Sequence, residues 1–137
     1  MIADVISYPR SQPIGSVLTL GVAVFFVCMG ASGLFNPKGV VERFGMTADT
    51  PDARAEIRAV YGGFGIGVAA LLAFALTLPT SARHAIWMTI GVCTLSMALG
   101  RATRLFDGGR ARFNPTWLFF LVELALTGAL AAATVLD

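Results

Sequence analysis

A single acid stands in the middle of the last apolar segment of the chain. Glu123 lies in the run 115–136, which contains no other charged residue. A charge at the centre of a membrane helix costs about 2.5–3.5 kcal/mol on insertion scales, so such a side chain is normally internal and paired. The chemistry open to this carboxylate is to bind a small ligand or a lipid head group, or to carry a proton. Glu123 is therefore the residue from which we predict a functional site.

Arg101 is the predicted partner of Glu123, because the end of the third helix and the start of the fourth should meet on one side of the membrane. The other candidates for a polar pocket in this half of the bundle are Arg58, Tyr61, Glu56 and Arg104. We expect Glu56 and Arg58 to close the mouth of the pocket. Two interpretations stay open: a pocket that binds a ligand, or an ion pair that only fixes the third helix to the fourth.

No catalytic residue, metal ligand or cofactor is predicted, because no nucleophile, metal cluster or cofactor motif accompanies Glu123. The two cysteines, Cys28 and Cys93, lie inside apolar segments and form no Cys-x-x-Cys pair, so we expect them to be small buried hydrophobes. The glycines of 62–67 do not fit the nucleotide-binding pattern G-x-G-x-x-G. A net charge of only +2, without a basic run, argues against a nucleic-acid partner.

The composition indicates a membrane protein of one domain, 1–137. Hydrophobic residues make up 56% of the chain and charged residues 13%, whereas a soluble domain has about 25% charged residues. A spanning helix needs about 20 apolar residues. The segments that supply them are 14–35, 51–78, 85–106 and 115–136. With short connections they predict an all-α fold, a transmembrane four-helix antiparallel bundle in a lipid bilayer.

The connection between the first two helices should contain a short interfacial helix over 38–45. Its apolar residues fall on one side of a helical turn, and Gly45 can close it. Thr50, followed by a proline and an aspartate, predicts the start of the second helix with Thr50 as its N-cap. His84 is expected in the turn before the third helix, where it would be solvated.

Small residues predict where helices approach one another. Gly63 and Gly67 form a Gly-x-x-x-Gly pair in the second helix, and Gly100 belongs to a small, weakly polar face of the third. Together with the thin loops, this glycine face indicates association with another integral membrane protein, or with a second copy in a homodimer.

Basic residues predict the orientation of the chain in the membrane. Lysine and arginine gather in the connections 36–55 and 107–114 and at the helix ends beside them. The positive-inside rule then places both connections in the cytoplasm and both termini on the periplasmic side.

Several of these residues also match a family pattern. The stretch Glu56-Ile57-Arg58-Ala59-Val60-Tyr61-Gly62-Gly63, followed by Gly100-Arg101, Asp107-Gly108 and Glu123, resembles a bacterial family of small four-helix membrane proteins. That family is domain of unknown function 4345, and it is loosely similar to the DoxX-like membrane proteins. The resemblance covers most of the chain. It implies the four-helix architecture and the bacterial inner membrane, and it brings no activity.

The sequence therefore predicts a non-enzymatic membrane protein, either an accessory subunit of a larger membrane complex or a binder of a small ligand or lipid. One alternative is a proton-linked transporter, in which Glu123 titrates or binds substrate and Arg101 is its counter-ion. Another is a membrane enzyme for a lipid or quinone-like substrate, with Glu123 as general acid or base.

Overall fold

The computed structural model describes residues 12–107 and 113–137. Residues 108–112, which belong to the predicted connection 107–114, lie outside the described part, as do residues 1–11. Within the described ranges the chain is helical and contains no strand. The helices are α1 (Pro13–Phe35), α2 (Pro37–Glu42), α3 (Pro51–Ile57), η2 (Arg58–Gly63), α4 (Phe64–Ala75), α5 (Thr80–Ala102), η3 (Thr103–Leu105), η4 (Phe113–Trp117) and α6 (Leu118–Leu136).

Consecutive pieces combine into four helices that are long and apolar enough to cross a membrane. They are Pro13–Phe35, Pro51–Ala75, Thr80–Leu105 and Pro115–Leu136. The most apolar stretch of each buries at most a third of its residues inside the chain. The apolar surface that stays exposed on these helices fits a lipid environment. The predicted fold class is confirmed: the chain is an all-α, multi-pass membrane protein.

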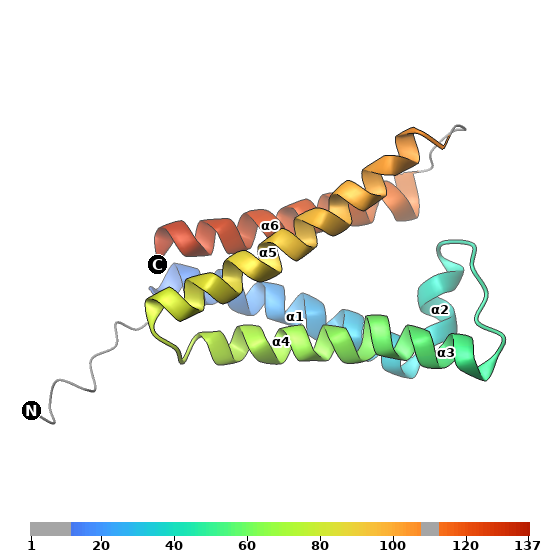
Figure 1. Cartoon of the computed structure of the whole chain (residues 1–137), viewed down its shortest axis with the longest axis horizontal. Coiled ribbons are helices and arrows are strands. Elements are labelled where there is room, and N and C mark those ends of the chain that lie inside the picture. The colour runs from blue at the N-terminus through green and yellow to red at the C-terminus, as the bar shows by residue number, and fades with distance from the viewer. Residues whose placement is uncertain (1–11, 108–112) are drawn as a thin grey trace, which may run out of the picture.

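Helix α1 is the central element of the bundle. It packs against α4 and η2 on one side and against α6 on the other, while α5 packs along α6. Figure 1 shows that α4 and α5 meet near the turn that joins them and diverge toward the other end of the bundle. The short helix α2 lies at that open end, together with α3 and far from the C terminus.

The turn between α4 and α5 is shorter than the sequence suggests. Helix α4 ends at Ala75, and the backbone N–H groups of residues 76–78 then bond to carbonyls three residues back, which tightens the last turn. Helix α5 begins at Thr80 and not at Ala85, because Pro79 is its N-cap and accepts a hydrogen bond from the backbone of Arg83. His84 therefore lies inside a helix, one turn after its start, and its expected place in the preceding turn is wrong.

The backbones of α1 and the second spanning helix touch at glycines. A Cβ on Gly33 would lie 2.6 Å from the backbone nitrogen of Gly62, and one on Gly65 would lie 3.0 Å from Cα of Gly30. Such close approach of two helices needs residues without side chains. The contact holds α1 against η2 and α4 along the middle of the bundle.

The predicted packing glycines do not make this contact. A Cβ on Gly67 or on Gly100 would meet nothing within 4 Å, and one on Gly63 would meet only a carbonyl of its own helix at 3.8 Å. The buried stripe of α4 instead follows Gly65, Val68 and Leu72, and Gly67 falls between its members. Contact of the outward-facing glycines with another protein stays a prediction.

The segment between α1 and α3 follows the predicted local signals. Helix α2 provides the expected short helix, and Gly45 ends the segment with a φ of +73°. The side chain of Thr50 accepts a hydrogen bond of 3.1 Å from the backbone of Ala53, as expected of an N-cap. Val41 is buried together with Ile57, so α2 is held against the start of the second spanning helix.

We expect the substitution Gly33→Ala to destabilise the bundle by about 1–3 kcal/mol, because its methyl group would force two backbones apart. Gly67→Ala is the matched control, since its methyl group meets open space, and it should be neutral or stabilise by about 0.5–1 kcal/mol. Thermal unfolding of both variants in detergent measures the difference. If Gly67→Ala lost stability and Gly33→Ala did not, the close contact between α1 and the second spanning helix would not run through Gly33.

Candidate functional site

An ion pair joins α5 to α6 at the open end of the bundle. Nε of Arg101 donates hydrogen bonds to both carboxylate oxygens of Glu123, each at 2.9 Å. The Glu123 side chain is 5% exposed and that of Arg101 is 20% exposed. Arg101 lies in the last turn of α5 and Glu123 near the start of α6. The pairing expected from the sequence is therefore present.

Two phenyl rings pack against the guanidinium group of Arg101. Its Cζ atom lies 5.5 Å from the ring centroid of Phe44 and 5.4 Å from that of Phe119, and the two centroids are 5.6 Å apart. The three centres form a nearly equilateral triangle, so both rings lie on the same side of the cation. Each contact has cation–π geometry. Phe44 follows α2, and we call residues 37–45 the α2 segment. This contact therefore connects the α2 segment to the ion pair.

A second polar contact lies one turn deeper between α5 and α6. The hydroxyl oxygens of Thr94 and Thr127 are 2.8 Å apart, and one donates to the other. The backbone carbonyl of Glu123 is 2.9 Å from the Thr127 hydroxyl and accepts from it. Hydroxyl contacts of this kind hold membrane helices together where no hydrophobic force acts between them.

A cavity of about 250 Å³ adjoins the ion pair. Its wall is built by α1, the α2 segment, η2, α5 and α6, and most of it is apolar. The apolar side chains include Phe25, Phe26, Met29, Met97, Phe119 and Leu126. The polar side chains in the wall include Glu123, Arg101, Tyr61, Arg43 and Asn36.

The structure brings some of the candidate residues together and leaves others apart. Glu123, Arg101 and Tyr61 share the cavity wall, and Tyr61 is held there by the π-helical turn η2. Wide turns of this kind occur often at functional sites. Glu56, Arg58 and Arg104 do not line the cavity.

Arg58 has a different position from the one expected. It is exposed, and its Nε donates a hydrogen bond of 3.2 Å to the backbone carbonyl of Leu34. This bond satisfies a carbonyl in the last turn of α1. Two residues of the α2 segment, Arg43 and Phe44, occupy the wall instead. Sequence reasoning missed them because the segment has the pattern of an amphipathic surface helix, and only its fold over the bundle brings them to the cavity.

The expectation that both cysteines are buried is wrong. Cys28 and Cys93 are exposed on the helix surfaces, and Cys28 also lines the cavity. An apolar segment does not place a cysteine inside the chain when most of each helix faces lipid. Among the residues that the structure describes, no group of three His, Cys, Asp or Glu side chains could hold a metal ion.

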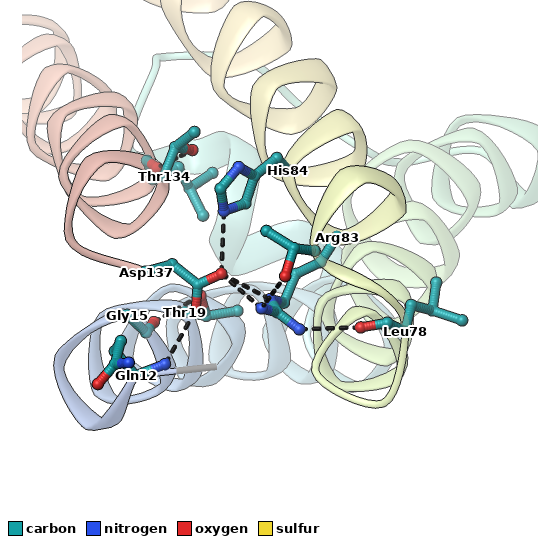
Figure 2. Close-up of polar contacts among 10 residues, drawn as sticks. Gln12, Gly15, Thr19, Leu78, Arg83, His84, Thr134 and Asp137 are labelled. Carbon is teal, nitrogen blue, oxygen red and sulfur yellow. Dashed lines mark hydrogen bonds and ion pairs between the residues drawn. The ribbon is translucent and has the colours of Figure 1, made fainter. Parts of the chain in front are cut away.

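A second charged cluster closes the opposite end of the bundle (Figure 2). Oδ2 of Asp137 accepts from Nε of Arg83 at 3.0 Å and from the terminal Nη2 of the same side chain, and it lies 2.9 Å from Nε2 of His84. The backbone N–H of Gln12 donates to Oδ1 at 2.9 Å. The cluster therefore ties together the ends of α1, α5 and α6. The expectation that His84 is only solvated is wrong.

Burial and pairing act in opposite directions on Asp137. Burial of this carboxyl group raises its pKa, but hydrogen bonds from Arg83, His84 and the backbone of Gln12 outweigh that effect and lower the pKa below its ordinary value. Arg83 is 1% exposed and packs over the ring of Trp87, whose centroid lies 5.6 Å from its Cζ atom. The role indicated for this cluster is structural, since its charges are buried and paired with one another.

We expect Asp137 to make stability depend on acid pH. Because its folded pKa is lowered, its contribution is complete above the unfolded value of about 3.9 and is lost as the pH falls through the folded value. Asp137→Asn should cost about 3 kcal/mol at neutral pH, because it leaves Arg83 buried without a counter-charge. Thermal unfolding between neutral and acid pH tests this. The exposed acid variant Glu56→Gln is the control and should keep the wild-type stability at neutral pH.

The ion pair at the open end should behave differently in single and double variants. Glu123→Leu leaves the charge of Arg101 unpaired and should cost about 3–5 kcal/mol, whereas Arg101→Leu combined with Glu123→Leu should recover most of that loss. A double-mutant cycle from thermal unfolding measures the coupling. Additive losses would mean that the two side chains do not stabilise one another.

Comparisons with known proteins identify the family and nothing beyond it. The family described as Domain of unknown function (DUF4345) matches residues 14–134, which covers nearly the whole chain. The searches of curated proteins and of solved structures each found no match. The looser similarity to DoxX-like proteins stays a prediction. On its sequence match and its four apolar helices, the chain belongs to the DUF4345 family.

Proposed function

We propose that this protein binds a small molecule or a lipid in the cavity beside Glu123 and Arg101 and performs no chemical step on it. The observation that carries the proposal is the composition of the wall. Ligand sites are concave and mostly apolar, with a few convergent polar groups that orient the ligand. The cavity of about 250 Å³ combines an aromatic and aliphatic wall with one buried acid, two arginines and a tyrosine.

An ion pair that served only to fix two helices would not need a cavity. Buried pairs of that kind are replaceable by packed apolar side chains, since their value to stability is small. Here the pair lies in the wall of an open space, and the α2 segment adds Arg43 and Phe44 to the same wall. This arrangement favours a binding role in addition to the structural one.

The geometry of Glu123 favours binding over acid–base catalysis. Both of its oxygens accept from Nε of Arg101, which holds the acid as an ion pair. A general base needs an oxygen directed at the proton it takes.

We place the protein in the bacterial inner membrane, with the connections 36–55 and 107–114 in the cytoplasm. The end of the bundle with α2 and α3 carries Lys38, Arg43, Arg54 and Arg58. At the other end, Arg83 is paired with Asp137 and does not act as a free topology signal. This distribution supports the orientation by the positive-inside rule.

A protein partner would use a different surface. Gly63 and Gly67 are exposed and would let a helix of another membrane protein, or of a second copy, approach closely. This surface supports a role as an accessory subunit, which is compatible with ligand binding because it lies outside the cavity wall.

Native mass spectrometry of the chain, released gently from its own membrane, tests the proposal. We expect a reproducible small adduct in the wild type that Met97→Trp lowers about tenfold, which is a loss of about 1.4 kcal/mol in binding free energy, because the larger indole ring takes up space in the cavity. Met88→Trp is the matched control: both methionines are exposed on α5, but only Met97 lines the cavity.

The same experiment has outcomes that contradict binding in the cavity. An adduct that is equally abundant in both tryptophan variants would place the ligand elsewhere. A stoichiometric protein partner without any small adduct would favour the accessory subunit instead.

A further inference from the structure

We propose that the ligand is a single-chain anionic amphiphile, an oxyanion head group on one apolar tail. The head group, a carboxylate or a phosphate, would accept hydrogen bonds from the terminal nitrogens of Arg101 and from Arg43. The tail would lie against Phe25, Phe26 and Leu126. This inference rests on the proposed function, since it requires that the cavity holds a ligand.

The first argument is the unused end of the Arg101 guanidinium group. Glu123 accepts only from Nε, so neither Nη1 nor Nη2 has an acceptor within residues 12–107 and 113–137. In the same ranges, Nε1 of Trp87 is the one side-chain nitrogen or oxygen that is fully buried and has no hydrogen-bond partner. Since Nη1 and Nη2 of Arg101 have no partner either, they cannot be fully buried and are therefore accessible. Their fixed fork matches the paired oxygens of a carboxylate or phosphate.

The second argument is the balance of charge in the wall. Its acidic and basic side chains are the carboxyl group of Glu123 and the guanidinium groups of Arg101 and Arg43, so basic groups exceed acidic groups by one. Arg43 is exposed and makes no ion pair within the described part of the chain, whereas Lys38 of the same segment lies 3.6 Å from Asp49. A ligand with one negative charge would neutralise the wall. Attraction between unlike charges is stronger near a protein than in bulk water.

The third argument is that the unused polar groups are donors. Besides the arginines, the hydroxyl of Tyr61 makes no hydrogen bond to any described residue, and the acceptor Oδ1 of Asn36 is already occupied by the backbone N–H of Gly39 at 3.1 Å. The carboxylate of Glu123 is engaged by Arg101. The cavity therefore offers donors and requires a ligand rich in acceptors, as an oxyanion is.

The fourth argument is size. A cavity of about 250 Å³ lies just below the range of about 300–1,000 Å³ for pockets that enclose a drug-sized ligand. That space suits a head group and the first part of one chain. Two exposed residues of the spanning helices, Cys28 and Met97, belong to the wall. The cavity is therefore open there, and the rest of a tail can extend into the bilayer.

Photo-crosslinking of the purified full-length chain, in a zwitterionic detergent, tests the ligand class. The probes are a long-chain fatty acid with a diazirine in its tail, its methyl ester, and an alkyl phosphate with the same tail. Labelled peptides are mapped by mass spectrometry. We expect the acid, the phosphate or both to label residues of the cavity wall about tenfold more than the ester, as expected for a hydrogen bond to a charged group.

The matched variants are Arg43→Gln and Lys38→Gln, which remove the same charge from the same exposed segment. Only Arg43 lines the cavity, so only Arg43→Gln should weaken labelling by the anionic probe, about tenfold, and it should leave ester labelling unchanged. Neither variant removes a partner of Glu123, so neither should disturb the fold. Equal weakening of labelling in both variants would mean that labelling depends only on the charge of the surface. That result would overturn the proposed contact between Arg43 and the head group.

The outcomes separate the ligand class from the proposed function. Labelling by the acid but not the phosphate, or the reverse, supports the proposal and identifies the head group. Equal labelling by acid and ester that Met97→Trp abolishes would overturn the anionic ligand and leave the binding cavity intact. Labelling of the cavity wall no stronger than that of the lipid-facing helix surfaces would overturn both.

Discussion

A carboxylate inside a membrane bundle has to be paired, and this constraint organises the open end of the molecule. The cost of an unpaired charge at that depth, about 2.5–3.5 kcal/mol on insertion scales, is as large as the gain from burying a whole apolar side chain, about 1.5–3 kcal/mol. Glu123 in α6 is therefore matched by Arg101 in α5, and the cation is covered by Phe44 and Phe119. Because Phe44 directly follows α2, the same pair also contributes to holding this part of the chain against the bundle.

The two ends of the bundle use buried charge in contrasting ways. At the C-terminal end, Asp137 accepts hydrogen bonds from the N-cap residue of α1 and from two side chains of α5, and Arg83 uses Nε and both of its terminal nitrogens. At the open end, Arg101 uses Nε alone within the described residues, and a cavity adjoins it. A fully matched cluster stabilises one arrangement of helices, whereas unused donors beside a cavity are available to a ligand. The difference lies in the hydrogen bonds and not in the residue types.

Hydropathy and charge predicted the parts of this structure that depend on the bilayer. Apolar length predicted the four spanning helices, and the Thr-Pro-Asp pattern predicted the Thr50 cap. The cost of an unpaired charge in the bilayer predicted the Glu123–Arg101 pair. The contacts of α1 with η2 and α4 through Gly30, Gly33, Gly62 and Gly65 could not be predicted, because sequence spacing does not say which glycine face meets another helix. The Arg83–Asp137 pair was missed for a similar reason. Its partners are far apart in sequence, and each has the appearance of an ordinary charge at a helix end.

The sequence left open whether the ion pair is structural or functional, and the geometry of arginine makes that choice unnecessary. A guanidinium group presents Nε on one edge and Nη1 and Nη2 at its end, so it can serve two acceptors in one rotamer. Glu123 takes the first edge and orients the side chain. On the proposed function, the end can face an oxyanion without any loss of the pair, so the group that stabilises α5 against α6 would also orient the ligand. On this proposal, stability and binding share Arg101 and are separable only through residues such as Arg43, which contact the ligand without contacting Glu123.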